Sequence, residues 1–126
     1  MAYTPTHQAA NQLEPAVMAL PPMAKASGGL TFSFECPWDN VRIAYANGTV
    51  TTAVTTEALV ITIKKSSTSL YTITTGTTDA IGTQVDGVFV ADAVFSRGDT
   101  ITVTTTDSAN PGAACAYLFF ERVRSI

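Results

Sequence analysis

From residue 30 onward, apolar and polar residues alternate with a period of two. Leu30, Phe32 and Phe34 are separated by polar residues, and the same alternation returns over residues 59–64 and 100–105. Successive side chains of a strand point to opposite faces of a sheet, so this period predicts half-buried β-strands. No helix of typical length is predicted after residue 28.

Turn signals separate the predicted strands at intervals of about eight to twelve residues. Residues 65–68 join the alternating segments 59–64 and 70–75 into a hairpin, and residues 96–99 form a turn before the next strand. Asn47-Gly48 predicts another tight turn. Strands at this spacing predict an all-β fold, an antiparallel β-sandwich, with a jelly-roll topology expected first and an immunoglobulin-like topology second.

The last predicted strand, residues 114–123, is apolar on both faces. Tyr117 and Phe119 occupy one face, while Leu118 and Phe120 occupy the other. Such a strand lies at the centre of a fold, or its outer face meets a partner. We expect Phe120 to be a partner contact.

Residues 1–29 differ from residues 30–126, and we expect an N-terminal arm followed by a β-sandwich domain. The arm holds four of the six prolines and all three methionines. Proline cannot donate a ladder hydrogen bond, which favours an extended path outside a regular sheet. The segment is either a disordered tail or an arm that docks on a neighbouring subunit, and its apolar residues favour docking. The predicted contacts of the arm are Leu13, Val17, Met18 and Leu20.

The chain is poor in charge, with 13% charged residues and a net charge of −3. Lysines and arginines do not cluster, so nucleic acid is not an expected partner. No run approaches the roughly 18 apolar residues that a membrane helix needs, and the N-terminus lacks the features of a signal peptide. We therefore expect a protein made in the cytoplasm, without membrane association, which leaves the cell by lysis or inside a particle.

No residue pattern indicates an enzyme, a metal site or a cofactor. His7 is the only histidine and lies in the predicted arm, far from any preorganised nucleophile. Cys36 and Cys115 lack the spacing of a zinc site, and the aspartates near turns form no dense calcium-binding cluster. We expect the two cysteines to be small buried side chains. A disulfide between them requires the first strand to lie beside the last.

One aromatic residue is a candidate for ligand binding. Trp38, the only tryptophan, follows Pro37 and is a possible sugar platform, because carbohydrate modules on sandwich folds stack sugars on exposed aromatic rings. The tyrosines Tyr45, Tyr71 and Tyr117 fall on the apolar phase of their strands, so we expect them in the core.

Strands rich in Thr, Ala and Val occur here together with few charges, a leading arm and the turn and strand over residues 96–103 (SRGDTITV). In this combination, residues 30–123 resemble the small β-sandwich proteins of tailed-bacteriophage virions, which include capsid decoration (cement) proteins, head fibres and tail accessory domains. The resemblance implies a structural virion protein, with a homotrimer favoured, that binds the major capsid protein and holds neighbouring capsid subunits together. It implies no catalytic residues. The alternative is a tail or fibre adhesion domain that binds host-surface carbohydrate through Trp38.

Overall fold

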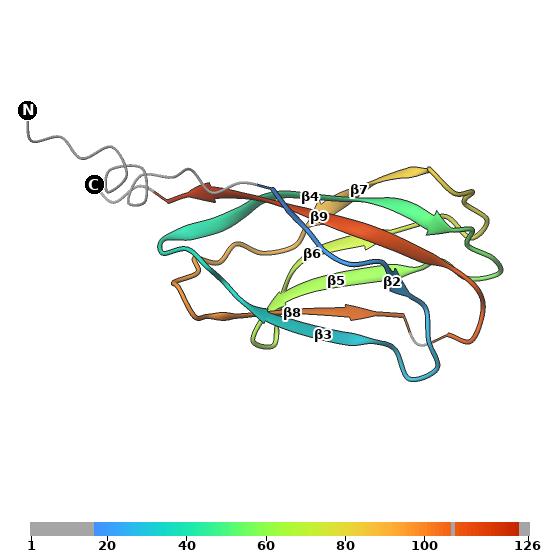
Figure 1. Ribbon diagram of the computed structural model, residues 1–126, viewed down its shortest axis with the longest axis horizontal. Helices are drawn as coiled ribbons and strands as arrows, with labels where there is room; N and C mark the ends of the chain where they lie inside the picture. The colour runs from blue at the N-terminus through green and yellow to red at the C-terminus, as the bar shows by residue number, and fades with distance from the viewer. Residues whose placement is uncertain (1–16, 107, 124–126) are drawn as a thin grey trace, which may run out of the picture.

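The computed structural model describes residues 17–106 and 108–123, and this part of the chain is built from antiparallel strands (Figure 1). It contains nine strands and no helix. The all-β, antiparallel class predicted from the alternation is confirmed. The strands are β1 (Val17–Ala19), β2 (Met23–Ala24), β3 (Thr31–Glu35), β4 (Val41–Thr52), β5 (Val60–Lys65), β6 (Thr68–Thr74), β7 (Gln84–Phe89), β8 (Thr100–Thr105) and β9 (Ala113–Arg122).

The strands form one curled sheet in the order β1-β9-β4-β7-β6-β5-β8-β3, with β2 also paired to β9. Figure 1 shows β4, β7 and β9 above β3, β5 and β8, and the pairing of β6 with β7 joins the two layers. The pairings are nested, because β5 pairs with β6, β4 with β7, β3 with β8 and β1 with β9. The chain therefore follows the path of one long hairpin that is rolled upon itself.

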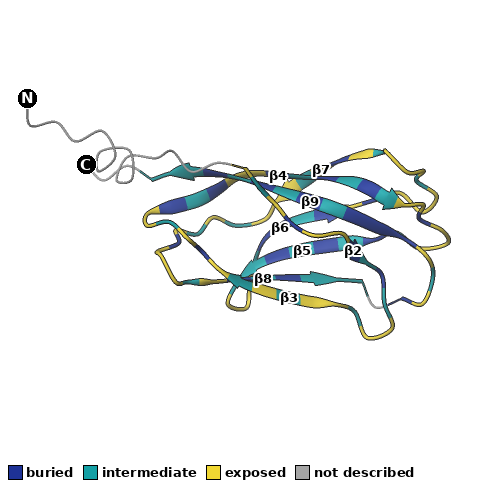
Figure 2. Cartoon of the chain, in the orientation of Figure 1, coloured by how far each residue is buried: buried dark blue, intermediate teal, exposed yellow. Residues whose placement is uncertain are grey.

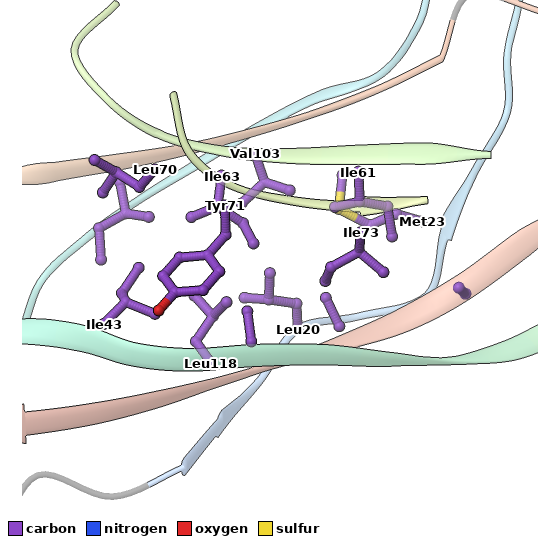
Figure 3. Close-up of a cluster of buried hydrophobic side chains, with 14 of the residues drawn as sticks. Leu20, Met23, Ile43, Ile61, Ile63, Leu70, Tyr71, Ile73, Val103 and Leu118 are labelled. Carbon is purple, nitrogen blue, oxygen red and sulfur yellow. The ribbon is translucent and has the colours of Figure 1, made fainter. Parts of the chain in front are cut away.

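The core lies between the two layers, where the inward faces of the strands meet (Figure 2). Ile61, Ile73 and Leu118 are inaccessible to solvent, and Figure 3 shows them in one cluster with Leu20 and Met23. Burying an aliphatic side chain of this size stabilises a fold by about 1.5–3 kcal/mol. The period of two in the sequence is what places one side of each strand in this cluster.

The hairpin predicted over residues 59–75 is confirmed. β5 and β6 pair from Val60↔Thr74 to Lys65↔Thr68, with a register shift after Ile63. Ser66 closes the turn with a φ of 54°, the left-handed conformation that a tight hairpin turn requires. The turn predicted over residues 96–99 is also present, since the Asp99 amide donates to the Ser96 carbonyl.

The tight turn predicted at Asn47-Gly48 is wrong, because both residues lie inside the 12-residue strand β4. Asn47 pairs with Asp86 on β7 and with Tyr117 on β9. A Cβ atom at Gly48 would lie 3.2 Å from the Cys115 carbonyl oxygen and from Ile73 Cγ2. The close approach of the neighbouring strands therefore explains why a glycine stands at position 48. The Asn47-Gly48 pair continues the strand and forms no turn.

A β-bulge at Ala44 overturns the expectation that Tyr45 lies in the core. The register of β4 against β9 passes from Ile43↔Phe120 to Tyr45↔Phe119, which leaves Ala44 unpaired. One extra residue reverses the faces of the side chains that follow. Tyr45 is therefore 39% exposed on the outer face. Tyr71 is buried as predicted, whereas Tyr117 is half-buried.

Residues 17–24, which the sequence assigns to the arm, lie along β9 of the same chain. Val17 pairs with Phe119, Met23 pairs with Ala114, and the Leu20 amide donates to the Ala116 carbonyl. Pro21 and Pro22 separate β1 from β2 because a proline nitrogen has no hydrogen to donate. This segment forms the edge of the sheet beside β9. The buried side chains of Leu20 and Met23 anchor it in the core.

Candidate functional site

A shallow groove of about 250 Å³ opens where β4 and β6 approach the end of β7. It is bounded by charged residues on one side and by aromatic residues on the other. β4, β6, β7, β9 and the segment after β7 each supply part of the wall. The lining residues are Arg42, Ile43, Ala44, Tyr71, Phe89, Asp92 and Glu121.

Arg42 links two carboxylates at the charged side of the groove. It lies opposite Glu121 in the β4–β9 register, and its Nε and Nη2 atoms are each 3.0 Å from Glu121 Oε2. Its Nη1 atom is 3.2 Å from Asp92 Oδ2. The hydrogen bond to Glu121 is the largest cause, ahead of that to Asp92, of the raised pKa of Arg42. The two carboxylates thus hold the Arg42 guanidinium in one orientation. Exposed ion pairs of this kind contribute little to the stability of the fold.

Tyr71 closes the floor of the groove. Its ring extends from β6 toward β4 (Figure 3), and its hydroxyl donates to the Ala44 carbonyl at 2.9 Å. Burial is the main cause of the raised pKa of Tyr71. The bulge frees the Ala44 carbonyl from the β9 ladder, so the local irregularity of β4 supplies the acceptor for a buried phenol. The Phe89 ring lies edge-on to the Tyr71 ring, with centroids 5.7 Å apart.

The apolar side of the groove continues onto residues 88–94, which we call the apolar segment. Within it, Phe89 is 57% exposed, Val90 52% and Val94 41%. Val88 is exposed as well. Asp92, in the middle of the same segment, bonds to Arg42, which places the segment along the mouth of the groove. A short run of exposed apolar side chains beside a groove is typical of an interaction surface.

The groove places charged and aromatic groups side by side, an arrangement that suits a polar or amphipathic ligand. Both carboxylates are tied to Arg42, and the side chains of Asp92 and Glu121 are 48% and 42% exposed. Among the described residues that line the groove, the one hydroxyl group belongs to Tyr71, and it is bonded to the Ala44 carbonyl. Within residues 17–106 and 108–123, no three His, Cys, Asp or Glu side chains lie close enough to hold a metal ion.

The contacts predicted from the sequence are dispersed in the structure. Val17 is 50% exposed and Met18 is half-buried against the core, while Leu20 and Phe120 are buried within it. Leu13 lies outside the described residues. Because Leu20 and Phe120 serve the core, Val17 is the predicted contact that the fold leaves most open.

Trp38 lies away from the groove. It is half-buried against the core, and its ring centroid is 5.1 Å from that of Phe120. The sugar platform expected at Trp38 is therefore a partly covered ring, and it shares no wall with the groove.

The two cysteines are free thiols. Cys36 is buried as expected, whereas Cys115 is partly exposed.

A second exposed apolar cluster lies on the outer face of β1, β9 and β4. The Tyr45 and Phe119 rings are 5.4 Å apart, and Val17 is the cross-strand neighbour of Phe119. The Tyr45 hydroxyl donates to Asp86 at 2.7 Å, and this bond is the main cause of the raised pKa of Tyr45. We call Val17, Tyr45 and Phe119 the outer aromatic patch. The bulge at Ala44 creates it, so the alternation alone could not reveal it.

Comparison with known proteins adds no relative. No protein-family model, curated protein or solved structure matches the chain. Across the residues that the structure describes, no helix has the length and apolar character to cross a membrane. The function must therefore be argued from the surfaces described above.

Proposed function

We propose that this chain is a structural virion protein of a tailed bacteriophage, a capsid decoration (cement) protein that binds the major capsid protein as a homotrimer. The observation that carries the proposal is the anchored N-terminal segment. Leu20 and Met23 are buried in the core, while Val17 begins the sheet at its edge. The 16 residues before Val17 can span up to about 50 Å when extended, which is enough to reach a neighbouring subunit.

Within this role we propose a jelly-roll sandwich as the detailed fold. Four nested strand pairs support this topology, since a jelly roll arises when a long antiparallel hairpin is rolled into two facing layers. Jelly rolls occur in viral capsid proteins.

The outer faces of the sheet support a role in assembly. Across β3, β8, β5 and β6, the cross-strand row runs from Thr31 to Thr104, Thr62 and Thr72. Hydroxyl and methyl groups are cheaper to desolvate than charges, so such a face can be covered by another protein at low cost. On the opposite layer, the outer aromatic patch offers apolar area for a subunit contact.

The experiment is to purify the particles of the phage that encodes the chain and to quantify their proteins by mass spectrometry. A decoration protein should be present in a copy number comparable to that of the major capsid protein, and particle maps should show density bridging capsid subunits. Its absence from the particles, or a few copies restricted to the tail, would contradict the proposal. Light-scattering mass of the purified chain tests the trimer separately.

A second candidate function is adhesion to host-surface carbohydrate, and the groove favours it. Phe89 offers an exposed ring, while Arg42, Asp92 and Glu121 offer paired donors and acceptors. Sugars combine an apolar face with hydroxyl groups that such residues bind. Glycan-array binding that is lost in Arg42→Ala and retained in Trp38→Phe would support this function at the groove. Loss only in Trp38→Phe would support the tryptophan platform instead.

A further inference from the structure

The strand β3 forms one edge of the sheet and carries none of the usual barriers to pairing with another strand. Its register against β8 has no bulge, and it contains neither proline nor lysine. Figure 2 shows this strand exposed along one border of the molecule. Natural edge strands are commonly blocked by such residues or by bulges, because open backbone groups pair with other chains. At the opposite edge of the described sheet, Pro21 and Pro22 interrupt the strands, so β3 is the edge that is open to pairing.

The backbone groups of β3 that point away from the sheet belong to alternate residues. The Leu30 carbonyl and the Cys36 amide both form hydrogen bonds on the β8 side of the strand. Backbone N–H and C=O groups alternate between the two sides of a strand, so the even-numbered residues of this stretch face β8. Thr31, Ser33 and Glu35 therefore direct their N–H and C=O groups outward, and all three residues are exposed.

The sequence of β3 (TFSFE) fits a second copy of itself. In an antiparallel pair centred on Ser33, Thr31 lies opposite Glu35 of the second copy. The three residues whose backbone groups point outward then meet in hydrogen-bonded positions, where each pair of residues exchanges two backbone bonds. Glu35 is the one charged residue of the strand, and it faces a threonine in this register. The pairing thus brings no like charges opposite each other.

Phe32 and Phe34 supply the apolar part of this contact. Both are half-buried and packed against the core, and their ring centroids are 5.7 Å apart. In the same register, Phe32 lies opposite Phe34 of the second copy, in a position without backbone hydrogen bonds, where facing side chains come closest. Aromatic pairs across strands stabilise a sheet. Each ring would therefore cover part of a ring of the second copy.

We propose that two copies of this chain pair antiparallel through β3, about a two-fold axis at Ser33, and so join their sheets. The contact goes beyond the proposed capsid role and does not depend on it. It lies at the opposite end of the sheet from β1, so it is compatible with a trimer that forms through other faces. Because β3 has only five residues, the dimer is weak in dilute solution and is favoured by a high local concentration.

Disulfide trapping in the full-length protein tests the contact. Ser33→Cys in a Cys115→Ser background places two thiols at the axis, where hydrogen-bonded positions lie about 5.5 Å apart, within the reach of a disulfide. Cys36 can stay, because it is buried. The matched control is Thr102→Cys in the same background, since the Thr102 hydroxyl lies 3.3 Å from that of Ser33 on the same face. Its two copies would be three strand spacings, about 14 Å, apart.

The expected result, after incubation with oxidised glutathione at millimolar protein concentration, is a dimer yield several-fold higher for Ser33→Cys than for Thr102→Cys. An equal mixture of Thr31→Cys and Glu35→Cys should give a mixed dimer. Thr31→Cys alone should give little, because its two copies lie four residues, about 13 Å, apart along the strand. Equal yields from positions 33 and 102 would overturn the proposal. A Thr31→Cys dimer in place of the mixed dimer would overturn the register about Ser33.

Ser33→Pro gives a second readout that needs no disulfide. It removes an amide hydrogen that points away from β8, so the ladder between β3 and β8 keeps its hydrogen bonds. Ser33→Thr is the control, and circular dichroism and thermal unfolding verify that both variants fold. The light-scattering mass should rise with concentration in Ser33→Thr, and Ser33→Pro should lack this rise. Equal masses of the two folded variants at every concentration would overturn the contact. A trimer would persist in both variants, so the two assemblies are tested separately.

Discussion

The hydroxyl of Tyr71 on β6 donates a 2.9 Å hydrogen bond to the carbonyl oxygen of Ala44, the bulge residue of β4. This bond connects strands that are not neighbours in the sheet, because β7 lies between them. It fixes the bulge that turns Tyr45 outward, and it forms the floor of the groove. The Tyr71 side chain therefore supports both the groove and the outer aromatic patch.

Tyr71→Phe should lower the free energy of unfolding by about 0.5–1.5 kcal/mol, because the part-buried hydrogen bond to the Ala44 carbonyl is lost. Urea unfolding measures the change. Tyr45→Phe is the matched control, since it removes the hydroxyl of an exposed tyrosine bonded to Asp86. Equal decreases in the free energy of unfolding would mean that the bond to Ala44 contributes no more than the exposed bond to Asp86.

The stability of the protein should fall at alkaline pH, and Tyr71 should account for part of the fall. Burial raises the pKa of Tyr71 in the folded state, so the unfolded chain loses this proton first, near pH 10. The stabilisation is complete below that pH and is lost as the pH rises through the folded pKa. Urea titrations between about pH 8 and 11 should show a shallower decline for Tyr71→Phe. The decline that remains should include Tyr45, whose pKa is raised by its bond to Asp86.

Lys25→Met should destabilise the protein by about 2–3 kcal/mol, because two backbone carbonyls lose a charged donor. The buried Lys25 places its Nζ 2.9 Å from the Thr55 carbonyl and 2.6 Å from that of Glu57. These bonds join the N-terminal segment to the loop after β4. Lys64→Met, on the outer face of β5, is the control and should change stability by less than about 0.5 kcal/mol. Comparable unfolding midpoints for both variants would contradict this role for Lys25.

Gly87→Ala should be among the most damaging single-methyl additions in the described chain. A Cβ atom at Gly87 would lie only 2.4 Å from the Ala46 carbonyl oxygen, which belongs to the backbone of the neighbouring strand. The strands must separate or shift, at a cost of about 2 kcal/mol or more. Gly48→Ala, where the nearest atoms lie at 3.2 Å, should cost less. Thermal unfolding of the two variants gives the order directly, and a reversed order would be inconsistent with this packing.

The two cysteines should react with a thiol reagent at very different rates. Cys115 is partly exposed and should react in the folded protein, whereas Cys36 is buried and should react only when the chain unfolds. Burial also raises the pKa of Cys36, which lowers its thiolate fraction at neutral pH. Titration with an aromatic disulfide should show one fast thiol per chain, and Cys115→Ser should abolish that fast phase. Two fast thiols would contradict the burial of Cys36.

The regular part of the fold was predictable, because one side of each strand is continuously apolar. The hairpin of β5 and β6 follows from that pattern with its turn at Ser66. The pattern fails where geometry interrupts the period. The unpaired Ala44 reverses the faces after Ile43, and the close neighbours of Gly48 place an apparent turn pair inside a strand.

The candidate site was beyond the reach of sequence reasoning for a different reason. Arg42, Asp92 and Glu121 come from three separate parts of the chain and have no common spacing. Only the β4–β9 register and the path after β7 bring them together. One local signal was available, since Asp92 interrupts an apolar run with a charge that needs a partner.

The nested pairing of the strands also constrains when the sheet can form during synthesis. The inner hairpin of β5 and β6 is complete as soon as its short turn has left the ribosome. β4, β3 and β1 emerge earlier but must wait for β7, β8 and β9, respectively. Because Val17 pairs with Phe119, closure of the sheet depends on contacts that are distant in sequence, and such contacts form slowly. Until β9 has been made, Leu20 and Met23 have no core to enter, so these apolar side chains stay exposed in the nascent chain.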